Sequence, residues 1–405
     1  MDDPTSVLFG LRDFEVLEVV ETDDAVIVTV QTVNPVLLCP DCGHTAGRSR
    51  GRPTVTLRDV RVGVRPCRVR WAKHRRACAN EACERRSFTE QHPAVGERRR
   101  TTARLRVEVA RQAGRCARPI TEVAAEHAVG WHLVMRSIHE DAQARRLGVE
   151  IPPVRHLGVD ETTYRRRRRF VTNLADVEHG VEIDVIEGRS AGSFGAWLAA
   201  RPQAWRAGVQ VVAMDASGPF RSAVQQQLPH ATIVLDRFHA LRLFHNAIDD
   251  IRRRMAWQLH VRRGRKIDAA WRYRHFLLTG WDRLKPEHQD RLLRLFNGPE
   301  DPDGELAWAY LIKETARETW RSPSIGAWGN LLQLLADSPS GEHRRLGRTL
   351  DAWHDEIVAS FTIRVTNAAT EGLNRKVKQV KRAGCGYRNQ HNYKIRVLQH
   401  CGPKP

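Results

Sequence analysis

Val154-Arg-His-Leu-Gly-Val-Asp-Glu-Thr-Thr-Tyr164 contains a short apolar run followed by two acidic residues. The run Leu157-Gly-Val159 predicts a buried strand, which Asp160 and Glu161 close. A carboxylate at the end of a central strand is held rigidly, and this suits a metal ligand. Neighbouring side chains on a strand point to opposite faces, so we expect only one of the two acids to face a metal ion.

Two acidic residues far downstream complete a candidate set. Asp215 ends the apolar run Val209-Gln-Val-Val-Ala-Met214, and Glu371 lies in a segment of helical spacing that begins near Thr366. Carboxylates are the ligands that Mg²⁺ and Mn²⁺ prefer. We therefore expect Asp215 and Glu371 to converge with Asp160 on two divalent ions. The ordinary alternative for Asp215 is an N-cap of the following helix.

The composition indicates a polyanionic partner. The 405 residues include 66 Lys and Arg against 47 Asp and Glu, which gives a formal charge of +19. Nucleic acid is the commonest partner of such a chain, and an anionic membrane surface is the competing one. No apolar run reaches the ~18 residues of a membrane span, and Met1-Asp-Asp-Pro4 opens no signal peptide. We expect a cytosolic protein whose eight cysteines are thiols or metal ligands.

Four of the cysteines form two pairs, Cys39-Pro-Asp-Cys42 and Cys78-Ala-Asn-Glu-Ala-Cys83, around the strand-like stretch 61–71. Two such pairs around a hairpin are typical of a four-thiolate zinc ribbon, with His44 or His74 as possible substitutes for one sulfur. The ordinary alternative is two unrelated pairs of buried thiols. A small basic module has a thin core, so a metal would stabilise it. The expected Zn²⁺ ligands, in a module spanning 1–92, are Cys39, Cys42, Cys78 and Cys83.

The spacing of apolar residues becomes helical from Glu97 to about Arg146. Two helices joined by a short turn with glycine are typical of a helix-turn-helix, whose last helix enters the major groove of DNA. A plain three-helix packing module is the alternative, and the basic charge favours DNA binding. We assign residues 97–150 to this domain. The expected helices are Arg98–Arg111 (stopped by Gly114), Pro119–His127 (with Thr121 as a possible cap) and Trp131–Ala144.

Strands and helices alternate between residues 155 and 236. Three strands followed by helix, strand, helix and strand are the order of a ribonuclease H-like domain, in which the first and fourth strands are neighbours. Asp160 and Asp215 would then lie side by side, and Asp236 would be a helix cap or a supporting carboxylate. The expected strands are His156–Asp160, Phe170–Leu174, Val181–Ile186, Val209–Met214 and Thr232–Leu235, and the expected helices are Ser193–Ala200 and Pro219–Leu228.

An all-helical insertion is expected at 241–360, inside a catalytic core made of residues 154–240 and 361–400. Seven of the eleven tryptophans fall in the insertion. Most of them are expected to pack in its core, and a minority to stack on an unpaired base.

Two polar segments are candidate DNA contacts. The run Arg165–Arg169 leads into the second strand and suits phosphate contacts, although a solvated face explains it equally well. In the helix that carries Glu371, the polar residues Asn367, Glu371, Asn374 and Lys378 are spaced by 4, 3 and 4 positions and therefore share one face. The alternative is a plain surface helix. The candidate DNA-contacting residues are Arg165, Arg167, Arg169, Asn367, Asn374, Lys378, Lys381 and Arg382.

In combination, these motifs resemble transposases of the ISL3 family of bacterial insertion sequences. The resemblance implies a multidomain DDE transposase that uses Mg²⁺ or Mn²⁺, binds terminal inverted repeats and moves its element as DNA. It also implies that Asp160, Asp215 and Glu371 are the catalytic triad. The matching pieces are the two cysteine pairs, Gly158–Glu161, Met214–Ser217, Val234–His239, Thr366–Asn374 and Lys381–Asn389.

The expected partners are double-stranded DNA, at the inverted repeats and at the target, and a second copy of the chain in the DNA complex. The expected location is the bacterial cytoplasm, on the nucleoid and away from membranes. Two rival functions are a structure-selective nuclease or resolvase with the same fold and metals, and a domesticated DNA-binding regulator without catalysis. The intact acidic triad argues against the regulator.

Overall fold

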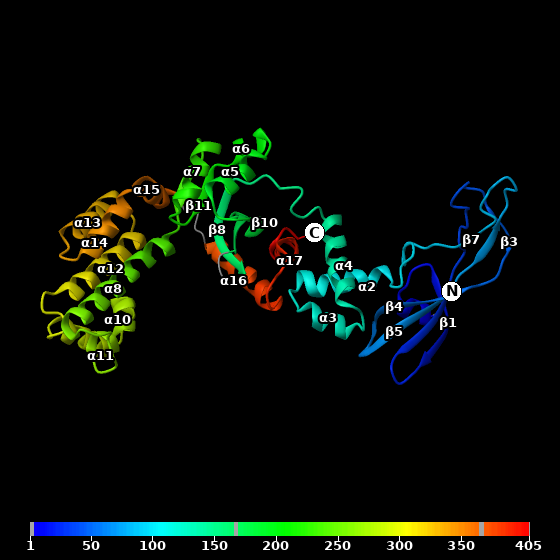
Figure 1. The fold of residues 1–405 in the computed structure, drawn as a ribbon, viewed down its shortest axis with the longest axis horizontal. Helices are drawn as coiled ribbons and strands as arrows, with labels where there is room; N and C mark the ends of the chain where they lie inside the picture. The colour runs from blue at the N-terminus through cyan, green and yellow to red at the C-terminus, as the bar shows by residue number, and fades with distance from the viewer. Residues whose placement is uncertain (1–3, 166–168, 364–367, 405) are drawn as a thin grey trace. The chain divides into compact units, whose positions relative to one another are not determined.

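The structure is a computed structural model that describes residues 4–165, 169–363 and 368–404, except the side chains of Arg165 and of residues 368–371. The contacts divide the chain into two units, one made of 1–150 with 376–405 and one of 151–375 (Figure 1). None of the described helices is both long enough and apolar enough to cross a bilayer.

The first unit begins with two β-sheets. The larger sheet has the order β1-β2-β5-β4 and a core around Trp71, and the smaller has the order β3-β6-β7. The expected strands around residue 61 form the hairpin β4–β5, but β5 pairs in parallel with β2 and not with the cysteine-bearing sheet. The alternating side chains of β5 explain this, because Val69 and Trp71 are buried in the larger sheet's core. The strands are β1 (Phe14–Glu21), β2 (Val26–Thr32), β3 (Ala46–Ser49), β4 (Thr54–Val62), β5 (Arg65–Ala72), β6 (Arg75–Cys78) and β7 (Ser87–Thr89), preceded by α1 (Pro4–Phe9).

Three helices follow where the helix-turn-helix was expected. The first begins at Ala103 and not at Arg98, because Thr102 caps it by accepting a hydrogen bond from the backbone of Leu105 at 3.3 Å. The second has Pro119 at its N-cap, so Thr121 is not a cap. The elements are α2 (Ala103–Ala110), a π-helical turn (Arg111–Arg115), α3 (Ile120–Glu126) and α4 (Trp131–Ala144).

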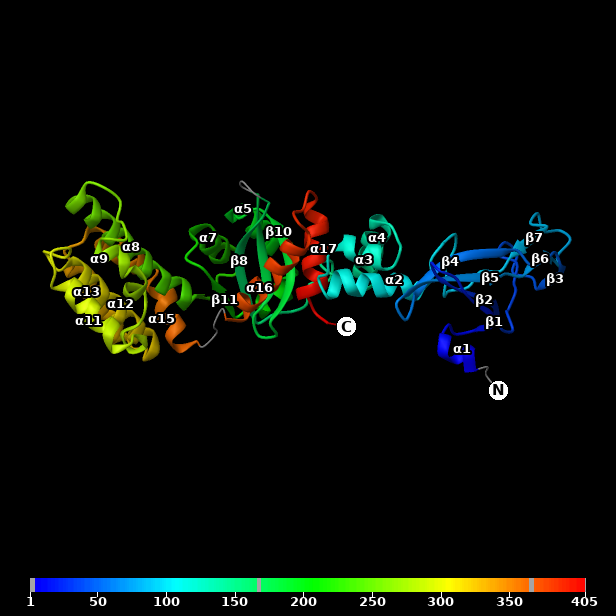
Figure 2. The ribbon, with the colours of Figure 1, turned by 90° about the horizontal axis from the view of Figure 1, so that it is seen from below.

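The last helix, α17 (Gln390–Cys401), packs against these helices (Figure 2). Ile395 joins their apolar core, and Gln399 donates a hydrogen bond to the Asp141 carboxylate at 2.7 Å. Gly114 lies inside the π-helical turn and does not end it; a Cβ at this position would lie 2.9 Å from Gln399 Oε1. The stretch 361–400, which we assigned to the catalytic core, is therefore divided between the two units.

The second unit is built on a five-stranded sheet of order β10-β9-β8-β11-β12. The first and fourth of its strands, β8 and β11, pair in parallel, as the sequence predicted. Strand β8 continues to Arg165 and does not end at Asp160, because its second half forms a hairpin with β9. The strands are β8 (His156–Arg165), β9 (Arg169–Asp176), β10 (Val181–Glu187), β11 (Val211–Met214) and β12 (Thr232–Leu235), with helices α5 (Ala191–Ala199), α6 (Gln203–Gly208) and α7 (Gly218–Gln227).

Helices α5 and α7 cover one face of this sheet and share a core with Leu157 and Val159. Beyond β12 the described chain is helical as far as α15, as expected for 241–360, although the first helix already begins at Arg237. Two apolar clusters hold these helices together, and Trp328 is almost fully buried in one of them. The helices are α8 (Arg237–His260), α9 (Ala269–Arg272), α10 (Arg274–Leu278), a short 3-10 turn (Trp281–Arg283), α11 (Pro286–Phe296), α12 (Glu305–Arg321), α13 (Ile325–Asp337), α14 (Gly341–Asp351) and α15 (His354–Thr362).

A tight loop joins α16 (Ala368–Ala383) to α17. Cys385 and Gly386 both have positive φ, and the chain turns back so that the buried Tyr387 donates a hydrogen bond to the Val380 carbonyl at 3.2 Å. A Cβ on Gly384 would lie 2.3 Å from Cε2 of the Tyr387 ring. Gly384 is therefore required by the close approach of this ring.

We predict that Gly384→Ala destabilises the protein by about 1–3 kcal/mol, because the added methyl displaces a buried ring. Gly326→Ala is the matched control, since a Cβ there meets nothing within 4 Å and alanine favours the helix. Urea unfolding followed by tyrosine and tryptophan fluorescence measures both variants. Equal stability of the two would contradict the packing described for Tyr387.

Candidate active site and nucleic-acid interface

Asp160 is the acid of the 160–161 pair that faces the interior. It is 8% exposed in the middle of β8, whereas Glu161 points away and forms an ion pair with Arg189 at 3.3 Å. The alternation of side chains along a strand explains the difference. The two side chains therefore lie on opposite faces of the strand, as the sequence predicted, and that Asp160 is the one that faces a metal ion stays a prediction.

Asp215 lies beside Asp160. The β8–β11 ladder pairs Val159 with Met214, and the two aspartates are the next residue along each strand. Burial, and then repulsion by the Asp215 carboxylate, raise the pKa of Asp160 to about 6. Asp160 is buried and Asp215 is half-buried, so the two neighbouring carboxylates concentrate negative charge that a bound cation would offset.

Helix α16 reaches this position through Asn374, which donates a hydrogen bond from its amide to the Asp160 carboxylate. The Asn374 Oδ1 atom is buried and has no hydrogen-bond donor among the described residues. Glu371 lies on the same helix three residues earlier, and its side chain is outside the described residues. The geometry thus brings the backbone that carries Glu371 to Asp160.

His239 belongs to the same cluster, and the sequence analysis did not single it out. Its Nδ1 lies 2.7 Å from Asp215 Oδ1 and 2.8 Å from Asp236 Oδ2. The two neighbouring carboxylates, Asp215 first, raise the pKa of His239 to about 10. Asp236 is 3% exposed and also caps α8 by accepting a hydrogen bond from the backbone of Phe238 at 3.0 Å. Asp236 is therefore a helix cap and a supporting carboxylate, as predicted, and it orients His239 toward Asp215.

Glu182, on β10, is a second residue that the sequence analysis missed. It lies fully buried, and neither carboxylate oxygen has a hydrogen-bond partner among the described residues. Burial, then repulsion by Asp160 and Asp184, raise its pKa well above the usual value. Glu182 pairs with Ala175, which pairs with Gly158, so it belongs to the sheet face that carries Asp160. The position of an acidic residue in a strand of the sequence does not show that its carboxyl group is buried, so the sequence analysis did not single out Glu182.

The four paired cysteines form the second cluster. Their sulfurs lie within 4.8 Å of one another, with Cys39 and Cys83 at 3.9 Å and Cys42 and Cys78 at 3.5 Å. A disulfide needs about 2.05 Å, whereas tetrahedral thiolates at about 2.3 Å from zinc stand about 3.8 Å apart. A hydrogen bond from the His44 backbone is the main cause that lowers the pKa of Cys42 to about 6, whereas burial raises the pKa of Cys78 to about 12, so Cys42 loses its proton more readily than Cys78 does.

Neither histidine near these sulfurs replaces one. The His44 ring contacts a backbone carbonyl, and His74 forms a 2.9 Å pair with Glu90. The fit to a four-thiolate site therefore needs no histidine.

The structure describes only part of the expected DNA-contacting set. Asn367 and Arg167, and the side chain of Arg165, lie outside the described residues. Arg169 is exposed beside the Tyr164 hydroxyl at 3.5 Å. Lys378 and Arg382 are exposed on α16, Lys381 is half-buried there, and the Asn374 amide is engaged with Asp160. On another side of α16, Leu373, Val377 and Val380 are buried.

Comparison with known proteins identifies the family. Residues 157–397 match the ISL3 DDE domain model, described as a transposase, and residues 90–142 match the model of the helix-turn-helix domain of transposase family ISL3. The chain belongs to the ISL3 family of transposases. It is a DDE transposase with a helix-turn-helix DNA-binding domain.

Two kinds of relative accompany this match. The chain is 25% identical over 377 residues to the transposase for insertion sequence element IS1001 of Bordetella parapertussis, covering 89% of this chain and 88% of the relative. It is 26% identical over 277 residues to the transposase for insertion sequence element IS1557 of two Mycobacterium tuberculosis strains, covering 62% of this chain and 61% of each relative. Membership of the ISL3 family favours the transposase over the two rival functions, a distinction that the fold alone did not make.

We predict that His239→Ala lowers DNA strand cleavage by this ISL3-family transposase by about 10- to 100-fold, the usual cost of removing a group that orients a ligand. His239→Asn, which keeps a donor near the position of Nδ1, should restore a large part of the activity. Cleavage is measured on a plasmid carrying the DNA that flanks the protein's own gene. Activity of the alanine variant equal to the wild type would show that Asp215 needs no such support.

Proposed function

We propose that Asp160, Asp215 and Glu371 hold two Mg²⁺ or Mn²⁺ ions and that this site cleaves and joins DNA at the ends of an insertion sequence. The observation that carries the proposal is the pair of carboxylates on adjacent strands, the buried Asp160 and the half-buried Asp215, with an amide of the Glu371 helix bonded to Asp160. The metals would neutralise the phosphodiester and activate water and then a DNA 3′-hydroxyl.

The protein's own residues position the reaction. Asp160 and Asp215 are fixed by paired strands and by His239, so little reorganisation is needed when charge develops. Asn374 fixes the Asp160 carboxylate by its amide and leaves one buried acceptor oxygen beside it. An acceptor-rich group of this kind suits a hard cation, because oxygen atoms are its preferred ligands.

Recognition is proposed to lie in the N-terminal parts of the chain. We place the reading of the terminal inverted repeats in 97–150, with the cysteine module 1–92 as a second DNA-binding part, while arginine-rich surfaces hold the backbone. Two DNA ends have to meet for transposition, so a homodimer in the DNA complex is part of the proposal. We place this reaction on the nucleoid in the bacterial cytoplasm.

We expect Asp160→Ala, Asp215→Ala and Glu371→Ala each to reduce strand cleavage at least about 100-fold, because bound metals supply several kcal/mol of transition-state stabilisation. Binding of the DNA ends should be nearly unchanged. Glu161→Ala is the matched control, since this exposed acid lies next to Asp160 on the same strand. Cleavage assays with Mg²⁺ or Mn²⁺ and gel-shift assays measure the two properties. Full cleavage by any of the three variants would refute its assignment.

We propose that Zn²⁺ binds Cys39, Cys42, Cys78 and Cys83 and stabilises the small sheet β3-β6-β7, whose apolar core is otherwise confined to these thiols and a few neighbours.

A strong chelator or Cys42→Ser is therefore expected to release about one zinc ion per chain and to expose 37–50 and 75–89 to protease. The sheet around Trp71 should resist, because it has a separate core. Metal analysis and limited proteolysis test this, with the exposed Cys116→Ser as control. Unchanged proteolysis without zinc would contradict the metal's structural role.

A further inference from the structure

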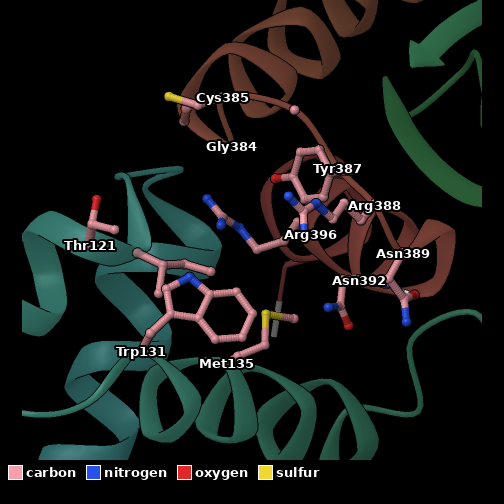
Figure 3. Close-up of a pocket in the computed structure, with 13 residues that line it drawn as sticks. Thr121, Trp131, Met135, Gly384, Cys385, Tyr387, Arg388, Asn389, Asn392 and Arg396 are labelled. Atoms are coloured by element: carbon pink, nitrogen blue, oxygen red, sulfur yellow. Dashed lines mark hydrogen bonds between the residues drawn. The ribbon is translucent and has the colours of Figure 1, made fainter. Parts of the chain in front are cut away.

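A cavity of about 400 Å³ lies within the first unit, between the helix-turn-helix and the loop that follows α16 (Figure 3). Trp131 and Met135 of α4 line one side, and Tyr387 and Arg388 of the loop line the other. Its volume is in the range of sites that enclose small ligands. The motif Gly384–Asn389 builds one wall, and the reaction proposed above gives this motif no role.

An exposed aromatic side chain lies at the start of α4. Trp131 is the first residue of this helix and is 41% exposed, although tryptophan usually buries most of its ring. The first turn of the second helix of such a motif is the part that approaches the DNA bases. An exposed indole inside a concave site offers a stacking face for a flat ring.

The cavity also carries positive charge with little compensation. Arg396 is 1% exposed, and its Nη2 donates a hydrogen bond to the Arg118 carbonyl at 3.1 Å. Among the described residues, its Nε has no hydrogen-bond partner and no carboxylate forms an ion pair with this side chain. A buried charge without a counter-ion is costly, so the site favours an anion. Arg388, exposed at the rim, is placed to contact one directly.

We propose that this cavity takes up one unpaired nucleotide of the bound DNA, with the base against Trp131 and a phosphate toward Arg388. A base inside a duplex cannot enter a concave site, whereas an extrahelical one brings a stacking face and an adjacent negative charge together. The proposal rests on DNA binding by the helix-turn-helix and deepens it. It gives the Gly384–Asn389 loop a role in holding a distorted DNA end.

The test compares the affinity of the full-length protein for two sets of DNA. One is the fully paired duplex of the footprinted element end, and the other is the same duplex with one extra thymidine at successive positions. At least one bulged duplex should bind about tenfold more tightly, since stacking on an aromatic side chain is worth about 1–3 kcal/mol per base. Trp131→Ala should abolish this gain, and Trp131→Phe should keep most of it.

The outcomes separate this proposal from DNA binding itself. Paired duplex bound without any gain from a bulge, or a gain unaffected by Trp131→Ala, would overturn the nucleotide site and leave the helix-turn-helix assignment standing. Failure to bind either set would overturn both.

Alkylation by N-ethylmaleimide gives an independent readout. Cys385 is exposed and lines the cavity, so the preferred bulged duplex should slow its modification, while the exposed Cys116 should react at the same rate with either duplex. Equal protection of Cys385 by paired and bulged DNA would also overturn the nucleotide site. Arg388→Gln should reduce the gain from the bulge, whereas the matched variant Arg382→Gln, on an exposed residue of α16 outside the cavity, should weaken both duplexes equally.

Discussion

The catalytic half of the protein depends on repulsion between two carboxylates that the fold forces together. Asp160 and Asp215 follow paired positions on adjacent parallel strands, and the pKa of Asp160 rises because burial and its neighbour both oppose its charge. The surrounding residues limit this repulsion, since Asn374 donates a hydrogen bond to Asp160 and His239 forms an ion pair with Asp215. This arrangement of carboxylates favours the binding of a cation, which fits the family to which the chain belongs.

The same logic explains the supporting residues. Asp236 caps α8 and also accepts a hydrogen bond from His239, which pairs with Asp215, so the start of that helix is fixed to Asp215. Asn374 ties α16 to β8, although 214 residues separate it from Asp160. The insertion of helices α8–α15 between these contacts leaves the sheet order intact, because α8 begins directly after the last strand of that sheet. The geometry of the proposed site is thus set by a few polar contacts between distant parts of the chain.

Much of this architecture could be predicted from the sequence. Alternating and continuous apolar runs located all five strands of the core, and their order gave the pairing of β8 with β11. The length of β8 was underestimated, because its polar second half is stabilised by the hairpin with β9. The packing of α17 against the helix-turn-helix was not predicted, since its apolar positions are compatible with more than one neighbouring element. The close contact between Gly114 and Gln399 joins segments that are far apart in the sequence, so it is visible only in the folded structure.

The site residues, too, include some that could be predicted from the sequence and some that could not. Asp160, Asp215 and the cysteine pairs stand at recognisable positions in sequence, whereas His239 and Glu182 acquire their roles from burial and contacts. When Fe²⁺ replaces Mg²⁺ in the proposed site, the addition of ascorbate and peroxide cuts the polypeptide near the bound ion, and mass spectrometry maps the positions of the cuts. If the three acids bind the same ions, cuts are expected around each of Asp160, Asp215 and Glu371. Cuts around the two aspartates with none near Glu371 would contradict the convergence of the three acids.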